Sequence, residues 1–142
     1  MRLVLDTNVV ISALLWRGKP YQLLEAVSRS RELRLFSSPA LLEELADVLA
    51  RPMAAKRLAL IGKTAAEVLA DYQAVVEVVE PRVVPRVVLR DADDDQVIAA
   101  AWAAQADFIV SGDSDLLSMG CYQTIHIINA AQALLRLQGQ SG

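Results

Sequence analysis

The chain has 142 residues, of which 54% are apolar, and this is enough for one domain with a well-filled core. Its net charge is −3, and its single cysteine excludes an intrachain disulfide, which favours a reducing cytoplasm. The mean hydropathy is +0.34, yet no segment reaches the roughly 18 to 20 apolar residues of a membrane span, and Asp6 interrupts any N-terminal signal peptide. We expect a single cytoplasmic domain, residues 1–142, without a membrane partner.

Strand and helix patterns alternate along the chain, which is typical of βαβ units with a mostly parallel sheet. Apolar runs mark the strands, whereas capping residues and helical spacing mark the helices. The expected elements are, in chain order, a strand at 2–6, helices at 8–15 and 20–30, a strand at 33–36, helices at 39–50, 64–76 and 94–105, strands at 107–111 and 124–128, and a helix from Asn129. We expect residues 139–142 to fray. The sequence therefore predicts the α/β fold class.

Five acidic side chains lie where a parallel sheet would gather them, beyond strand ends, at the start of a helix or inside a helix. Like charges a few ångströms apart repel one another unless a cation lies between them. Carboxylate oxygens are the ligands that Mg²⁺ and Mn²⁺ prefer. The five are Asp6, Glu44, Asp95, Asp113 and Asp115. This pattern predicts a site for divalent metal ions.

These acidic residues also have structural alternatives. Asp6 and Asp113 could cap the helices that follow them. Acidic residues in a first helical turn, such as Asp95, also complement the helix dipole. The Asp-rich run around Asp95 is not an EF-hand loop, because Gln96 stands where such a loop requires glycine. The residues alone leave the capping and dipole alternatives open.

Four short motifs, taken in order, resemble those of the PIN-domain family. They are Leu5-Asp6-Thr7-Asn8-Val9, Glu44-Leu45 with Val48-Leu49, Asp94-Asp95 with Val97-Ile98-Ala99, and the run from Val110 to Leu117. The match extends from residue 3 to about 117, and the sequence resembles above all the bacterial subgroup of toxin components of toxin–antitoxin pairs. The resemblance implies a three-layer α/β/α fold, a metal-dependent ribonuclease with one or two Mg²⁺ or Mn²⁺ ions, a cognate antitoxin and a homodimer.

The resemblance also implies roles for particular residues. The residues implied to be catalytic are Asp6, Glu44, Asp95, Asp113 and Asp115, and these together with Asp94 are the implied metal ligands. Asp95 is favoured over Asp94 as the third acidic ligand, because it stands three residues before Ile98, as in many family members. The groups expected to support the site are Thr7, Asn8, Ser12 and Ser111, the last at a position where the family usually has threonine.

Positive charge is concentrated early in the chain: residues 1–90 carry 13 basic and 10 acidic side chains, whereas residues 91–142 carry 1 and 7. Two prolines favour an extended segment or linker at 81–90, which would place Arg82, Arg86 and Arg90 on one side. These arginines are candidates for RNA contacts, and a solvated charged edge is the alternative. Further candidate phosphate contacts are Arg17, Lys19, Arg51, Lys56 and Arg57, whereas Trp16 and Trp102 are expected in the core or at an interface.

We therefore predict a ribonuclease that hydrolyses RNA phosphodiester bonds to 5′-phosphate and 3′-hydroxyl products, with the toxin role that the resemblance implies. Two alternatives come from other classes: a PIN-fold interaction module with weak or no catalysis, and another Mg²⁺-dependent α/β hydrolase. A phosphatase-like hydrolase is disfavoured, because it needs Asp-x-Asp after the first strand, and Asp6 is followed here by Thr7 and Asn8.

Overall fold

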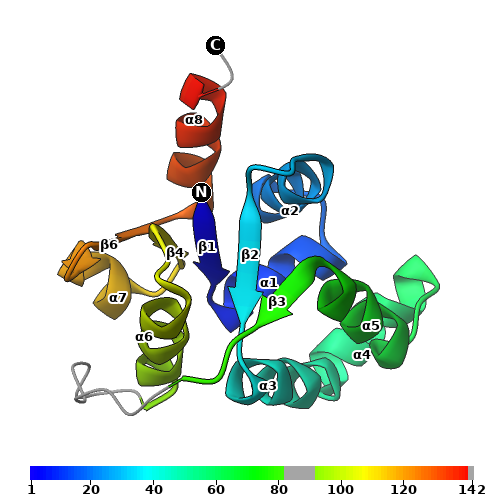
Figure 1. Cartoon of the computed structure of the whole chain (residues 1–142). Coiled ribbons are helices and arrows are strands. Elements are labelled where there is room, and N and C mark those ends of the chain that lie inside the picture. The colour runs from blue at the N-terminus through cyan, green and yellow to red at the C-terminus, as the bar shows by residue number, and fades with distance from the viewer. Residues whose placement is uncertain (82–91, 141–142) are drawn as a thin grey trace.

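Six strands form one sheet in the computed structural model, which describes residues 1–81 and 92–140 (Figure 1). They are β1 Arg2–Leu5, β2 Arg34–Ser37, β3 Val76–Val78, β4 Phe108–Val110, β5 Cys121–Tyr122 and β6 Ile125–Ile128. Their order across the sheet is β3-β2-β1-β4-β6-β5, and β5 pairs antiparallel with β6 while the other neighbours are parallel. After β1 the chain adds β2 and β3 on one side of the sheet, and after β4 it adds β5 and β6 on the other side. The boundary between β1 and β4 is therefore a topological switch point, where parallel α/β sheets bind ligands.

Helices cover both faces of the sheet, which confirms the α/β class and the three-layer arrangement. They are α1 Thr7–Leu15, α2 Lys19–Arg29, α3 Pro39–Leu49, α4 Pro52–Ile61, α5 Ala65–Val75, α6 Ala92–Ala104, α7 Ser114–Met119 and α8 Ala130–Gln140. Successive residues of β1 point to opposite faces of the sheet. Leu3 and Leu5 pack in the hydrophobic cluster with α1 to α5 and α8, whereas Val4 packs in the other cluster with α6 and α7. Because both faces of these strands are buried, they read as continuous apolar runs in the sequence.

Local capping signals fixed several helix starts that the sequence predicted. The Ser38 hydroxyl accepts a hydrogen bond of 3.2 Å from the Leu41 backbone N–H at the start of α3. Thr64 and Glu67 form a reciprocal capping box at the start of α5. Asn129 accepts from the Gln132 backbone N–H at 2.8 Å, at the start of α8. These bonds connect residues three apart in the chain, so they need no tertiary contact.

The structure contains four elements that the sequence analysis did not predict: α4, α7, β3 and β5. Pro52 ends the expected 39–50 helix, but it also occupies the first turn of α4, where a missing N–H costs nothing. The three strands or helices that remain are short, and β3 depends on its neighbour: Arg34 donates two hydrogen bonds of 2.8 and 2.7 Å to Glu77. Hydrogen bonding to Arg34 also lowers the pKa of the Glu77 carboxyl. Pairing across the sheet, rather than local pattern, stabilises the short strands β3 and β5.

The C-terminal helix and the segment 81–90 lie at the ends of the described ranges. The helix α8 continues through Gln140, so it includes the first two of the four residues, 139–142, that were expected to fray. The extended segment expected at 81–90 lies outside the described residues apart from Pro81. Among the helices of the described ranges, none combines the length and the apolar character needed to cross a membrane.

Candidate metal centre

The site lies where two neighbouring parallel strands end. β1 and β4 pair in register, with Leu5 opposite Val110, so the residues that follow each strand emerge at the same edge of the sheet. The Asp6 backbone N–H donates to the Val110 carbonyl at 2.9 Å, and this bond holds the residue that follows β1 beside the end of β4. This edge is the switch point of the sheet, where the topology leaves room for a ligand.

Three carboxylates from three chain positions meet at this edge. One oxygen each of Asp94, Asp113 and Asp115 lies within 4.8 Å of the other two. Asp94 is buried, with 4% of its surface exposed, whereas Asp113 and Asp115 are half-buried and open the cluster to solvent. Two oxygens on opposite sides of one Mg²⁺ are about 4 Å apart, twice the usual metal–oxygen distance of ~2.1 Å. An all-carboxylate donor set at this spacing therefore fits a hard divalent cation.

Asp113 also caps the helix that carries Asp115. Its Oδ1 accepts hydrogen bonds from the backbone N–H groups of Asp115 at 2.8 Å and Leu116 at 3.1 Å. The capping alternative raised by the sequence is thus realised at Asp113. The cap orients the first turn of α7 and holds Asp115 beside Asp113.

Asp6 occupies the capping position of α1, but its side chain makes no capping hydrogen bond. Its carboxylate is instead buried, and Oδ2 accepts a hydrogen bond of 2.8 Å from the Ser111 hydroxyl. The same hydroxyl oxygen accepts from the Asp113 backbone N–H at 3.0 Å. Ser111 therefore connects Asp6 to the loop that carries the carboxylate cluster, and the capping alternative fails for the Asp6 side chain.

Glu44 approaches the site from α3. Thr7, which is buried and follows Asp6 directly, donates its hydroxyl to Glu44 Oε2 at 2.9 Å. This bond joins α1 to α3 at the edge of the sheet and holds the half-buried Glu44 beside the first strand's exit. Its neighbours Glu43 and Asp47 are exposed and belong to the solvated face of the helix. Glu44 therefore differs from them in its burial and in its hydrogen bond from Thr7.

The remaining candidates take different positions. Asp95 is half-buried on α6 and is not a member of the three-carboxylate cluster. Asn8 is exposed and Ser12 half-buried, and within the described ranges neither side chain is hydrogen-bonded to a site carboxylate. The candidate RNA-binding residues Arg82, Arg86 and Arg90 lie outside the described residues.

By sequence, both Asp94 and Asp95 are candidates for the third acidic ligand, and Asp95 is favoured. In the structure, Asp94 is the one that lies in the three-carboxylate cluster. Asp94 lies three, four and seven residues before the fully buried positions Val97, Ile98 and Ala101. Residues at these spacings share one face of a helix. The signal for Asp94 was therefore its helical spacing relative to the apolar face, rather than its distance from Ile98 alone.

We predict that Ser111→Ala weakens the binding of Mn²⁺ about tenfold, the lower end of the effect of removing a hydrogen bond that orients a ligand. The buried Asp6 oxygen loses the Ser111 donor, and the Asp113 N–H loses the Ser111 acceptor. Ser111→Thr keeps the hydroxyl and should restore most of the affinity. The measurement is the Kd of each variant for Mn²⁺ by calorimetry, beside Ser118→Ala, whose exposed hydroxyl donates to the Ser114 carbonyl. Equal Kd values for Ser111→Ala and Ser118→Ala would show that Ser111 does not support the metal centre.

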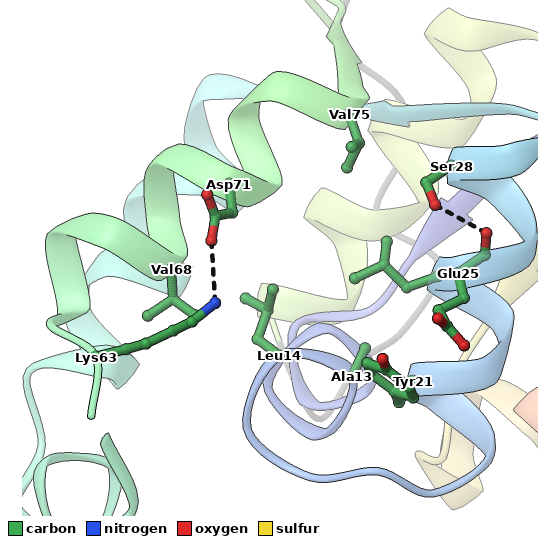
Figure 2. A pocket seen from close by; sticks show the side chains of 10 residues that line it. Ala13, Leu14, Tyr21, Glu25, Ser28, Lys63, Val68, Asp71 and Val75 are labelled. Carbon is green, nitrogen blue, oxygen red and sulfur yellow. Dashed lines mark hydrogen bonds and ion pairs between the residues drawn. The ribbon is translucent and has the colours of Figure 1, made fainter. Parts of the chain in front are cut away.

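A separate groove lies away from these carboxylates, between α2 and α5 and beside α1 (Figure 2). Its volume is about 250 Å³, and Leu14, Leu24 and Val68 contribute to its apolar lining. The salt bridge between Lys63 and Asp71, at 3.4 Å, lies at its border. None of the site carboxylates lines it, so this groove is not the metal centre.

Comparison with known proteins agrees with the fold and the cluster. A family model described as "PIN domain" matches residues 2–115. The chain is 30% identical over 120 residues to the uncharacterized protein MJ1680 of Methanocaldococcus jannaschii, and the alignment covers 84% of this chain and 75% of that protein. PIN domains are generally metal-dependent nucleases that bind divalent metal ions, which agrees with an acidic cluster at the switch point of the sheet. The chain belongs to the PIN-domain family.

Proposed function

We propose that this protein is an endoribonuclease that depends on Mg²⁺ or Mn²⁺ and hydrolyses RNA phosphodiester bonds. The observation that carries the proposal is the meeting of Asp94, Asp113 and Asp115 at the switch point of a PIN-domain sheet. A strongly negative site of this kind would repel a phosphodiester by itself, so substrate binding requires neutralisation by a cation. The proposed cofactor is therefore one or two divalent ions.

The role of each acidic residue would follow from how deeply its side chain is buried. Buried Asp94 would anchor the ion, and half-buried Asp113 and Asp115 would complete its carboxylate ligands on the side that faces solvent. A divalent ion held there supplies Lewis acidity toward the phosphodiester and makes water a stronger nucleophile. Asp6 and Glu44, fixed by the hydroxyls of Ser111 and Thr7, would accept hydrogen bonds from water or hold a further ion. The expected products are a 5′-phosphate and a 3′-hydroxyl.

The test is cleavage of an end-labelled single-stranded RNA by the purified protein in Mg²⁺, in Mn²⁺ or in EDTA. We expect cutting with either metal, none in EDTA, and loss of cutting in Asp113→Asn. Glu43→Gln is the control, because it also removes one carboxylate charge, but from an exposed residue outside the cluster. Folded protein that binds Mn²⁺ yet cuts no RNA would overturn the nuclease and favour the PIN-fold interaction module.

The physiological part of the proposal is the toxin role in a toxin–antitoxin pair, in the cytoplasm, as a homodimer that a cognate antitoxin inhibits. The resemblance of the four acidic motifs to those of PIN-domain toxins supports it. Induced expression should then arrest growth, and Asp94→Asn should relieve the arrest at equal protein levels. Arrest of equal strength by the variant would separate any toxicity from the carboxylate cluster.

A further inference from the structure

A basic and aromatic surface lies at the end of α1 that is remote from the metal centre. We call it the basic–aromatic surface; its residues are Trp16, Arg17, Lys19, Arg51, Lys56 and Arg57. Trp16 and Arg17 lie in the connection between α1 and α2, and Lys19 begins α2. Arg51 directly precedes α4, and Lys56 and Arg57 lie in the middle of α4. α1 contains nine residues, so its ends are about 13 Å apart at ~1.5 Å per residue. A strand of a few nucleotides can span that distance.

Two contacts between guanidinium groups and aromatic rings hold this surface in place. Arg57 Cζ lies 5.3 Å from the ring centroid of Trp16, and Arg57 Nε donates to the Leu15 carbonyl at 2.7 Å. Arg17 Cζ lies 4.9 Å from the ring centroid of Tyr21, and Arg17 Nη1 donates to the Tyr21 hydroxyl at 3.3 Å. Trp16, expected in the core or at an interface, keeps 42% of its surface exposed. Unpaired bases stack on aromatic rings and guanidinium planes that are held in place and partly exposed to solvent.

The charge of this surface differs from that of the chain. The segments 16–21 and 50–63 contain six basic side chains and no acidic one, although the net charge of the chain is −3. Lys63 is paired with Asp71. The other five take part in no ion pair with the residues described here: Arg17, Lys19, Arg51, Lys56 and Arg57. Unpaired cations beside aromatic rings are complementary to a polyanion with accessible bases.

We infer that the basic–aromatic surface binds single-stranded RNA on one side of the scissile bond, so that the strand follows α1 from Trp16 to the carboxylate cluster. The inference rests on the proposed ribonuclease function, and it adds the residues that would bind the strand beside the scissile bond. Met53 and Leu60 are each 78% exposed on α4, where a protein partner would find apolar contacts. The absence of acidic side chains from the segments 16–21 and 50–63 favours RNA, because a polyanion is complementary to cations of one sign, whereas the core of a protein interface is depleted of charged residues.

The test measures binding of a fluorescein-labelled oligouridine of about twenty nucleotides by anisotropy, in EDTA so that metal-dependent cutting cannot occur. Trp16→Ala should raise Kd about tenfold or more, because it removes a stacking platform. Arg17→Glu combined with Lys56→Glu should do the same and should flatten the dependence of log Kd on log salt by roughly 1 to 2. Both positions are exposed, so this variant tests the surface even if Trp16→Ala unfolds. The control is Arg31→Glu, an exposed arginine in the connection between α2 and β2, which should change Kd less than about twofold.

A parallel assay measures metal-dependent cutting of a labelled dinucleotide, whose single phosphodiester is the scissile bond, so that no further nucleotide is left to reach Trp16. If the nuclease proposal fails, neither RNA is cut, yet oligouridine binding still depends on the surface. If the surface inference fails, cutting persists while the Trp16 and Arg17/Lys56 variants bind oligouridine like the unmodified protein. A wild-type protein that binds no oligouridine at low salt also overturns the inference. Unchanged RNA affinity with a changed oligomeric mass would assign the surface to a protein partner.

Discussion

Replacement of Asp94 by Asn should reduce metal-dependent RNA cleavage at least about a hundredfold, more than the loss of a group that only orients a ligand. Asn keeps the size of the side chain but removes the one buried negative charge of the three-carboxylate cluster. The ion that neutralises the phosphodiester would then be held by Asp113 and Asp115 alone. The measurements are kcat/KM for RNA and the affinity for Mn²⁺ by calorimetry, and both should fall.

Asp95→Asn is the matched control, because the two residues are adjacent on α6 and carry the same charge. Asp95 is outside the cluster, so its replacement should cost less than about tenfold in kcat/KM and leave the Mn²⁺ affinity nearly unchanged. The reverse order of the two effects would show that the sequence-based preference for Asp95 is right and that the cluster is not the metal centre.

Divalent ions should stabilise the folded protein, by about 2.7 kcal/mol when the ion is a hundredfold above its Kd. The reason is that only the folded chain brings Asp94, Asp113 and Asp115 within 4.8 Å of one another, so the ion binds the native state preferentially. The free energy of unfolding is measured by urea denaturation in Mg²⁺, Mn²⁺ and EDTA. Asp94→Asn should lose most of this gain.

Screening by any salt also weakens repulsion among carboxylates, so the control is KCl at the same ionic strength. We expect K⁺ to supply only a small part of the stabilisation, because screening does not place a divalent charge between the three oxygens. Equal stabilisation by KCl and MgCl₂ would mean that the cluster is an ordinary acidic surface. This readout requires no RNA, and it therefore tests the metal centre independently of the nuclease.

The sequence was sufficient wherever short-range chemistry decides the structure. The strands β1 and β4 were predictable because Leu3, Val4 and Ile109 belong to apolar runs that only a doubly covered sheet can bury. The starts of α3 and α5 were predictable because Ser38 and Thr64 bond to backbone groups three residues away. The short elements β3 and β5 were missed because their hydrogen bonds go to β2 and β6, and such pairing leaves little trace in a few residues of sequence.

By itself, the sequence determined which carboxylates exist, which of them follow strands, and the family resemblance that they carry together. Only the tertiary structure decided which ones meet. Asp94 rather than Asp95 enters the cluster because burial of Val97, Ile98 and Ala101 fixes the rotation of α6 about its axis, and one residue along a helix turns a side chain by about 100°. Asp6 turns away from its own helix because β1 and β4 pair side by side and bring the Ser111 hydroxyl within 2.8 Å of it.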